Sequence, residues 1–346
     1  MPNPVLTAAI DALATGHDLP ADQASAVLAE IMSGNASEVE TSAVLIALRT
    51  KGETVEEIVG LARTMRAFAK PVRPARGDLI DTAGTGGGRQ TFNVSTTAAL
   101  IAAGAGCAVA KHGNRSATSQ SGSADVLEAL GVRIDLAPEA VANCIDRAGF
   151  GFMFAPAHHG ATRFVVPVRK ELAVRTIFNF LGPLTNPAGA TRQVIGVSDA
   201  RFIETLAVAV GRLGAAKAMV VSSEDGLDEL STSGATRVVE VGEDGGLRRY
   251  TLEPEDVGLA RARFEDVAGG TPADNAETAR RVLAAEPGPR RDLAVLNAGA
   301  AIYVAGAAET LEAGVREAEA ALDDGRAARA LDALVALSQE LAEVPA

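Results

Sequence analysis

A glycine-rich stretch, DTAGTGGGRQTFNVST from Asp81 to Thr96, lies between two apolar segments of the sequence. Four of the five residues at 84–88 are glycine, and Asn93 and Ser95 follow just before the second apolar segment. Glycine lets a ligand approach backbone N–H groups closely, and a helix that begins here adds partial positive charge. The stretch therefore favours phosphate binding, although an ordinary strand-to-helix turn could carry the same glycines.

A second polar stretch, KHGNRSATSQSGS from Lys111 to Ser123, follows another short apolar run. It contains two fixed cations, Lys111 and Arg115, the titratable His112, and five hydroxyl side chains in thirteen residues. Donors at this density near the start of a helix are suited to a large oxyanion. The alternative is a solvated polar loop, which has less need of two cations and two glycines.

The third stretch, SSEDGLDELSTSG at residues 222–234, is acidic and again follows an apolar run. Its carboxylates are Glu224, Asp225, Asp228 and Glu229. Mg²⁺ is commonly held by one or two carboxylates together with phosphates and water, although such a stretch alone is more often a solvated turn. Because ligands of open α/β sheets bind beyond the carboxyl ends of the strands, the three stretches together predict a phosphate site with magnesium.

The elements that precede the glycine-rich stretch are predicted to be helices only. Residues 1–70 contain two capping boxes, Ser37–Glu40 and Thr54–Glu57, and each is followed by residues with helical periodicity. The sequence KPVRP at 70–74 would end this part of the chain and is the predicted domain boundary. The apolar face predicted after the first capping box is formed by Val39, Ala43 and Ile46.

Beyond residue 74, short apolar runs alternate with helical segments, which predicts an α/β fold with helices packed on a sheet. The predicted strands are 79–80, 107–110, 151–155, 194–197 and 218–221. The predicted helices between them are 97–103, 124–130, 138–148 and 202–213. The C-terminal third is predicted to return to helix at 293–305, 309–322 and 326–341.

Composition excludes several classes of partner. The chain of 346 residues carries a net charge of -12, so its surface as a whole repels nucleic acid and anionic membranes. No apolar stretch is long enough to span a bilayer, and the N-terminus lacks the pattern of a signal peptide. Cys107 and Cys144, the two cysteines, lie in apolar surroundings and have no metal-ligand spacing. No disulfide framework is expected from them, which fits a reducing compartment, and a cytoplasmic location is predicted.

Four segments together resemble anthranilate phosphoribosyltransferase: GTGG followed by FNVST, KHGNRSATSQSGSADVLEALG, PVRKELAVRTIFNFLGPLTNPAG, and DGLDELS. The resemblance covers nearly the whole chain. It implies an α/β fold in which a small all-helical N-terminal domain packs on a larger α/β domain with a central mixed sheet flanked by helices, as in pyrimidine nucleoside phosphorylases. The helical domain would comprise residues 1–70 and part of 168–190, and the phosphoribosyl-binding domain residues 75–346. A homodimer formed through the helical domain is also implied.

The resemblance further implies transfer of the 5-phosphoribosyl group from phosphoribosyl pyrophosphate (PRPP) to the amine of anthranilate, with release of pyrophosphate, in tryptophan biosynthesis. Lys111 and Arg169 would be the catalytic residues. The implied PRPP contacts are Gly84, Gly87, Thr91, Asn93, Ser95, Thr96, Lys111, His112, Gly113, Asn114, Arg115, Ser116, Ser119 and Ser123. The implied anthranilate contacts are Gly84, Asn114, His159 and Arg169. Two Mg²⁺ ions per subunit would be held, one by Ser95 and Glu229 and the other by Asp228 and Glu229.

The sequence departs from the family pattern at two places. The family usually carries an Asp and one further residue after GTGG, whereas this chain has a shorter loop that lacks the carboxylate and contains Arg89. The family's HPAMK is HGATR here, residues 159–163, which leaves open a different aromatic acceptor. Two other functions are less compatible with the sequence. A pyrimidine nucleoside phosphorylase would carry a different phosphate loop, and a non-catalytic paralogue that binds nucleic acid would need a basic face.

Overall fold

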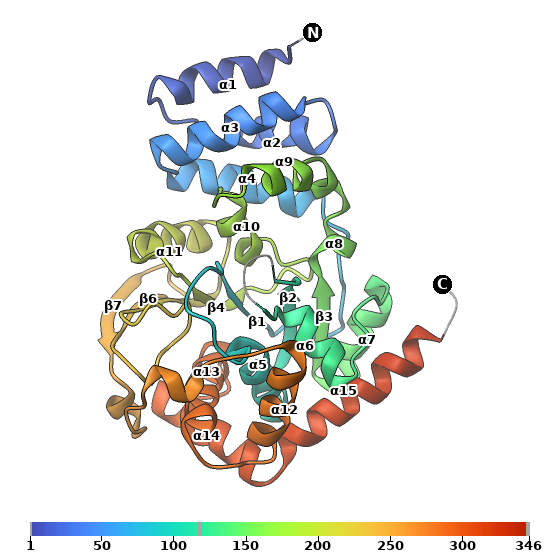
Figure 1. Cartoon of the computed structure of the whole chain (residues 1–346), viewed down its shortest axis with the longest axis vertical. Coiled ribbons are helices and arrows are strands. Elements are labelled where there is room, and N and C mark those ends of the chain that lie inside the picture. The colour runs from blue at the N-terminus through green and yellow to red at the C-terminus, as the bar shows by residue number, and fades with distance from the viewer. Residues whose placement is uncertain (1, 117–119, 344–346) are drawn as a thin grey trace.

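A computed structural model describes residues 2–116 and 120–343 of the chain. Within these residues, seven strands form one mixed sheet in the order β3-β2-β1-β4-β5-β6-β7 (Figure 1). Strands β3, β2, β1, β4 and β5 are parallel, and β6 and β7 are antiparallel to their neighbours. The strands are β1 (Leu79–Gly84), β2 (Ala108–Gly113), β3 (Phe150–Phe154), β4 (Arg192–Gly196), β5 (Lys217–Ser223), β6 (Thr236–Val241) and β7 (Leu247–Leu252).

The parallel strands bring the three predicted stretches to one edge of the sheet. Strands β1, β2 and β5 end at Gly84, Gly113 and Ser223, each close to the start of the glycine-rich, cationic or acidic stretch. In the register of the sheet, Gly84 pairs with Gly196 of β4, which itself pairs with Val221 of β5. The predicted convergence of the stretches at the carboxyl ends of the strands is therefore present in the structure.

One face of the sheet is covered mainly by C-terminal helices around α5, whose residues share one apolar core with β1, β2 and β3. Figure 1 shows these helices gathered at the end of the molecule opposite the N-terminus. The helices of this layer are α5 (Val94–Gly104), α6 (Ser123–Leu130), α7 (Pro138–Ala148), α12 (Pro272–Leu283), α13 (Pro289–Ala305), α14 (Leu311–Asp323) and α15 (Arg326–Ala342). The predicted C-terminal helices are thus confirmed.

The N-terminal helices occupy the other end of the molecule (Figure 1). They are α1 (Pro4–Ala14), α2 (Ala21–Met32), α3 (Glu38–Lys51) and α4 (Val55–Ala67). Both predicted capping boxes are present, because Ser37 and Thr54 each accept the N3 backbone N–H while Glu40 and Glu57 bond back to the cap. The predicted apolar face of α3 is not a buried face, since Val39 is 78% exposed and the helix buries Val44, Leu45 and Leu48 instead.

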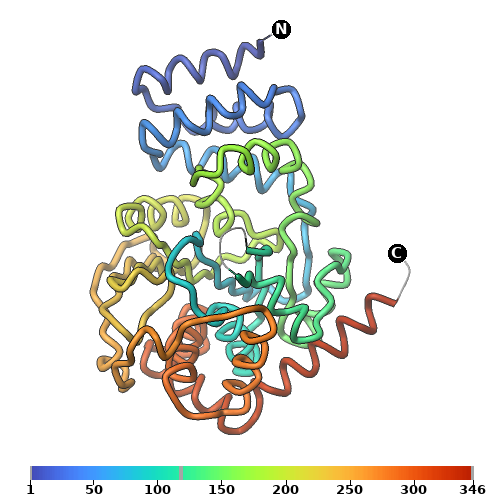
Figure 2. Tube along the Cα trace, in the orientation of Figure 1, coloured from blue at the N-terminus to red at the C-terminus, as the bar shows by residue number. Residues whose placement is uncertain are grey.

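A segment from the middle of the chain rises beside the N-terminal helices (Figure 2). It consists of α8 (Ala155–His158), the 3₁₀ helix η1 (Gly160–Phe164), α9 (Val166–Leu172) and α10 (Phe178–Leu184), and it contacts α2, α3 and α4. The following helix α11 (Ile203–Arg212) packs on β5 and β6 and also on α4. One apolar core therefore continues from the N-terminal helices onto the second face of the sheet.

The remaining elements are three short 3₁₀ helices, η2 (Ala200–Phe202), η3 (Pro254–Val257) and η4 (Phe264–Val267), among the residues that the structure describes. Cys107 and Cys144 are free and buried, and burial raises the pKa of each thiol to about 11. No helix within 2–116 and 120–343 is long and apolar enough to cross a membrane.

Candidate active site

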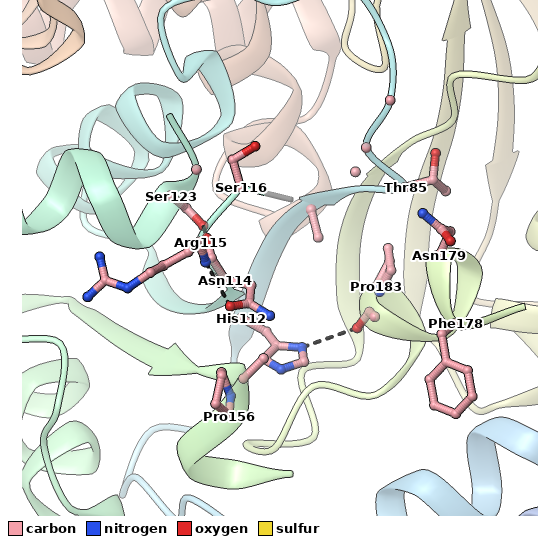
Figure 3. Close-up of a pocket in the computed structure, with 18 of the residues that line it drawn as sticks. Thr85, His112, Asn114, Arg115, Ser116, Ser123, Pro156, Phe178, Asn179 and Pro183 are labelled. Carbon is pink, nitrogen blue, oxygen red and sulfur yellow. Dashed lines mark hydrogen bonds between the residues drawn. The ribbon is translucent and has the colours of Figure 1, made fainter. Parts of the chain in front are cut away.

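A cavity of about 800 Å³ lies at the carboxyl ends of β1 and β2, where the sheet faces α4, α8 and α9. Figure 3 shows His112, Asn114 and Ser123 on one side of it and Phe178, Asn179 and Pro183 on the other. The residues of the sequence prediction that line the cavity are Gly84, Gly87, Asn93, Ser95, Thr96, Lys111, His112, Gly113, Asn114, Arg115, Ser116, Ser123, His159, Arg169, Asp228 and Glu229.

Two predicted PRPP contacts are not among these lining residues. Thr91 forms an isolated antiparallel bridge with Ala268, and the neighbouring Gln90 lines the cavity in its place. The structure thus places Thr91 beside the cavity lining, and its contact with PRPP stays a prediction. Ser119 lies outside the residues that the structure describes.

The glycine-rich loop needs residues without side chains because the acidic loop packs directly against it. A Cβ on Gly84 would lie 2.5 Å from Oδ2 of Asp228, and one on Gly88 would lie 2.8 Å from Oδ1 of the same residue. The backbone N–H of Gly86 donates to Asp228 Oδ2 at 2.8 Å, and Gly86 and Gly87 both have positive φ. Glycine at these positions therefore serves close approach to a carboxylate as well as backbone conformation.

Asn93 joins three segments at the start of α5. Its backbone is in the left-handed region, with φ 64, and its side chain does not cap the helix. Its Oδ1 accepts from Oγ of Ser121 at 2.8 Å and from Nδ2 of Asn275 at 2.8 Å, and its Nδ2 donates to the Ser121 carbonyl at 3.0 Å. The side chain thus fixes the glycine-rich loop to the cationic loop and to α12. Thr96 Oγ1, one turn into α5, is buried with no hydrogen-bond partner in the structure.

Lys111 is a buried cation at the base of the cavity. Its Nζ donates to the carbonyl of Thr82 at 2.5 Å, with Oγ of Ser95 at 3.4 Å. Burial lowers the pKa of Lys111 to about 8, and the nearby carboxylates of Asp81 and Glu229 oppose that shift. The ammonium therefore lies between the glycine-rich loop and the acidic loop, where it can neutralise negative charge on a ligand.

Asp228 and Glu229 form a largely buried pair of like charges. Burial raises the pKa of both carboxyls, and the charge of Asp228 raises that of Glu229 further. Glu229 Oε2 has no hydrogen-bond partner in the structure. Two adjacent carboxylates with an unsatisfied buried oxygen are a fitting environment for a divalent cation, and Ser95 lines the same part of the cavity.

The other acidic residues of this loop have structural roles. Asp225 accepts from Oγ of Ser223 at 2.9 Å and from Oγ of Ser231 at 2.6 Å, and Glu224 is exposed. Neither lines the cavity. Among the described residues there is no group of three His, Cys, Asp or Glu side chains placed to hold a metal. Magnesium here would accordingly depend on oxygen ligands from a bound phosphate or water in addition to the pair.

Two neutral histidines form the wall next to α8. Nδ1 of His112 lies 3.1 Å from the carbonyl of Gly182, and the rings of His112 and His159 are 5.0 Å apart. Burial lowers the pKa of His112 to about 3 and that of His159 to about 4, so both rings are uncharged at neutral pH. This wall offers an aromatic ligand flat, uncharged surfaces.

Arg115 does not direct its charge into the cavity. Its Nη1 forms ion pairs with Asp125 at 2.8 Å and Glu128 at 2.5 Å, and Figure 3 shows the side chain extending away from His112 and Asn114. These two hydrogen bonds, with Glu128 the larger cause, raise the pKa of the guanidinium. The sequence predicts a fixed cation here that contacts PRPP, and the structure shows that this charge has two carboxylate partners on α6.

The surroundings of the Arg169 guanidinium differ from those of Arg115. Arg169 lies on α9 with its guanidinium 5.4 Å from the ring of Phe178, and its side chain donates a long hydrogen bond of 3.5 Å to Oδ1 of Asn179. Burial lowers the pKa of this guanidinium. No carboxylate within residues 2–116 and 120–343 comes within 4.0 Å of its side-chain nitrogens. A largely buried guanidinium without an anionic partner is suited to receive a planar carboxylate from a ligand.

Comparison with known proteins identifies the family. Residues 76–328 match a family model described as the a/b domain of a glycosyl transferase family, and residues 7–69 match the helical bundle domain of the same family. Anthranilate phosphoribosyltransferase of Rubrobacter xylanophilus is 53% identical over 340 residues, which cover 98% of this chain and 99% of the relative. This chain belongs to the anthranilate phosphoribosyltransferase family.

Solved structures of the anthranilate phosphoribosyltransferase family have the same fold. The crystal structure of the Thermus thermophilus enzyme has a TM-score of 0.91 and 47% identity, and the match covers 96% of this chain and 99% of that one. The Saccharomyces cerevisiae enzyme in complex with PRPP and Mg has a TM-score of 0.89 and 27% identity, with 97% and 98% covered. The predicted arrangement, a helical N-terminal domain and an α/β domain with a mixed sheet, is confirmed.

In this member of the anthranilate phosphoribosyltransferase family, three residues that line or border the cavity were not selected by sequence reasoning. Arg175 and Asn179 lie inside the RTIFNFLGPLTNP segment, which carries the resemblance as a whole and not residue by residue. Ser198, after β4, bonds to the loop at Gly86. The polar residues of that segment, set among apolar neighbours, were the available signal for the first two.

The two departures from the family pattern have visible consequences. Arg89 does not add a cation to the cavity, because its guanidinium stacks 3.4 Å from the ring centroid of Phe264 and its N–H donates to Gly226 at 2.9 Å. In the altered 159–163 stretch, Gly160, Thr162 and Arg163 all line the cavity. The first departure therefore braces the loop from outside, and the second changes the wall itself.

Proposed function

We propose that this chain transfers the 5-phosphoribosyl group from PRPP to the amine of anthranilate, giving N-(5-phosphoribosyl)anthranilate and pyrophosphate, in tryptophan biosynthesis. One observation carries the proposal at the level of the site. The same cavity contains a glycine-rich phosphate loop beside the Asp228–Glu229 pair and also the guanidinium of Arg169, which has no carboxylate partner among the described residues. A polyphosphate with magnesium and a small aromatic acid are the two ligand types that these groups would recognise.

The residues of the chain act by positioning and by charge. Mg²⁺, held by Asp228 and Glu229 with Ser95, would neutralise the charge that develops on the leaving pyrophosphate. The Lys111 ammonium donates hydrogen bonds to the same leaving group, in a buried setting where such donors are strong. Two such ions per subunit are proposed, as the family resemblance implies.

The acceptor needs no strong base, because the amine of anthranilate is neutral and can attack the ribosyl carbon directly. Arg169 would bind the carboxylate, and Asn114, Gly84 and His159 would surround the ring and amine. The neutral His112 and His159 rings place no positive charge beside the electron-poor ribosyl carbon. Holding both substrates in this geometry supplies the rest of the rate enhancement.

We propose a homodimer formed through the N-terminal helices. Val5 of α1, Val39 and Ile46 of α3, and Val166 of α9 are exposed apolar side chains on helices that contact one another in that order. A second copy would cover this apolar surface. Sedimentation of a Val39→Asp variant should show monomers, and an unchanged dimer would contradict this interface. We also propose a cytoplasmic location and a domain division near residues 70–75.

The function is tested by following anthranilate fluorescence with enzyme, PRPP and Mg²⁺. A loss of signal that needs both PRPP and Mg²⁺ is expected. The Asp228→Ala/Glu229→Ala variant should lose the magnesium-dependent turnover, whereas Glu224→Ala, an exposed acid of the same loop, should retain it. Full activity of the double variant would contradict the metal assignment. PRPP binding without anthranilate consumption would indicate another aromatic acceptor, consistent with the altered 159–163 wall.

A further inference from the structure

Arg175 lies between α9 and α10, and its side chain reaches the glycine-rich loop. Nη2 donates to the carbonyl of Gly86 at 3.0 Å and to Oγ of Ser198 at 3.0 Å. Ser198 Oγ donates to the same Gly86 carbonyl at 2.9 Å. One peptide carbonyl of the loop is therefore held by two donors from outside the loop.

The guanidinium also fills the space beside the loop. A Cβ on Gly87 would overlap Nη2 of Arg175, so the absence of a side chain at Gly87 is what lets the guanidinium approach. Within the residues that the structure describes, no carboxylate lies within 4.0 Å of the Arg175 side-chain nitrogens. The positive charge of Arg175 therefore lies against the loop and the cavity that Arg175 lines, and not in an ion pair with a described carboxylate.

The segment that carries Arg175 also carries the acceptor side of the cavity. Asn179 Oδ1 accepts from the N–H of Thr176 at 3.1 Å and faces Arg169 Nη2 at 3.5 Å. The backbone carbonyl of Arg175 accepts from Nη1 of Arg49 on α3 at 2.7 Å. The segment is thus fixed at Arg175 by the N-terminal helices and at Asn179 by the acceptor site.

The loop is bound on its other side by the acidic loop. Gly86 N–H donates to Asp228 at 2.8 Å, next to the carbonyl that Arg175 holds. A continuous series of contacts therefore runs from Arg169 through Asn179, Thr176, Arg175 and Gly86 to Asp228. It joins the proposed carboxylate-binding group to a proposed magnesium ligand.

We propose that Arg175 is a positioning residue that couples the acceptor site to the pyrophosphate–magnesium site, so that each ligand binds more tightly when the other is present. This inference rests on the proposed function. An acceptor carboxylate on Arg169 restrains the segment up to Asn179, and Arg175 passes that restraint to the loop. The second ligand then meets a loop whose freedom is already reduced, which gives positive coupling.

The test uses anthranilate and inorganic pyrophosphate with Mg²⁺, a pair that cannot turn over. Anthranilate binding is measured by fluorescence and pyrophosphate binding by calorimetry, each with and without the other ligand. The wild-type chain should show an affinity gain of at least about 5-fold, equal in both directions because coupling is reciprocal. Arg175→Ala should bring this factor close to one. Ser198→Ala should lower it less, and the double variant should match Arg175→Ala because both side chains act on one carbonyl.

Arg201→Ala is the matched control, since Arg201 is an exposed arginine near Ser198 that pairs with Asp199 and does not line the cavity. A coupling factor of one in the wild-type chain, or an unchanged factor in Arg175→Ala, overturns the inference, as does an equal loss in the control. If the wild-type chain binds neither ligand, the proposed function fails as well; if both bind and only the coupling is unaffected, the role of Arg175 alone fails. Should Arg175→Ala unfold, Arg175→Lys and Ser198→Ala decide the question.

Discussion

Replacing Arg169 by alanine should weaken anthranilate recognition selectively. The guanidinium lies beside Phe178 with no carboxylate partner among the residues that the structure describes, so a bound carboxylate would be its main anionic contact. Hydrogen bonds between charged groups contribute about 1.5–3 kcal/mol each, and removing one partner of a buried charged pair costs about 2–5 kcal/mol. A loss of about 3 kcal/mol corresponds to roughly a 100-fold rise in the anthranilate KM.

The assay is steady-state loss of anthranilate fluorescence, with the KM for anthranilate and for PRPP measured separately. The PRPP KM should change by less than about 3-fold, because the Arg169 side chain contacts Phe178 and Asn179 and makes no direct contact with the phosphate loops that the structure shows. Arg169→Lys should fall between the wild type and Arg169→Ala, since an ammonium keeps the charge without the planar fork. Arg163→Ala is the matched control, because Arg163 also lines the cavity but stacks on Phe164.

Aniline, which lacks the carboxylate, makes this test sharper. The wild-type enzyme should prefer anthranilate over aniline strongly, and Arg169→Ala should lose most of that preference by losing activity on anthranilate alone. Equal losses on both acceptors, or equal rises in both KM values, would refute a carboxylate contact and assign Arg169 a purely structural role.

Three further outcomes follow from the structure. Glu229→Gln should raise the half-saturating Mg²⁺ concentration more than about 10-fold. In the absence of metal, the same change should raise the free energy of unfolding by about 1 kcal/mol, because it removes a buried charge next to a like charge. A loss of stability in urea titrations would contradict this. Ala285→Gly should stabilise the fold by about 1 kcal/mol, because Ala285 has φ 61 and glycine relieves the backbone strain of that conformation. Ala284→Gly, at a position with negative φ, should not stabilise it. Equal shifts in melting temperature for the two variants would contradict backbone strain at Ala285. His112 has a folded pKa of about 3 against 6.5 unfolded, so the stability it contributes is complete above pH 6.5 and is lost as pH falls towards 3, by up to about 5 kcal/mol. His112→Asn should flatten that pH dependence in denaturation experiments at several pH values, and an identical slope would exclude His112 as its source.

The strands and loops that make the cavity were predictable because each parallel strand is a short, largely apolar run that ends at a polar loop. The antiparallel strands β6 and β7 were not predicted. The sequence TRVVEV interrupts its apolar residues with Arg237 and Glu240, and LRRYTL is mostly exposed, so neither resembles a buried strand. Their pairing to β5 is a tertiary effect that local sequence does not encode.

Single-residue roles in the cavity depended on partners distant in the sequence. The sequence identifies Arg115 as a fixed cation but does not show its partners, Asp125 and Glu128, which lie ten and thirteen residues later and pair with it on α6. Val39 and Ile46 looked like a core face because periodicity shows that a helix is amphipathic without showing what covers the apolar side. The family resemblance supplied Arg169, which residue patterns alone would have left as a structural arginine.

The continuous apolar core has a consequence for protein engineering. Helix α4 buries Ile58, Val59 and Leu61 in the same core as Leu206 and Val210 of α11, the helix that packs on β5 and β6. The N-terminal helices are therefore not a transferable module. A chimaera that exchanges residues 1–70 alone would join two surfaces that were never shaped for each other. A crossover that also carries α9, α10 and α11, which contact α3 and α4, would keep more of the original fit. Recombination libraries of these enzymes should accordingly choose their breakpoints by shared core and not by the linker in the sequence.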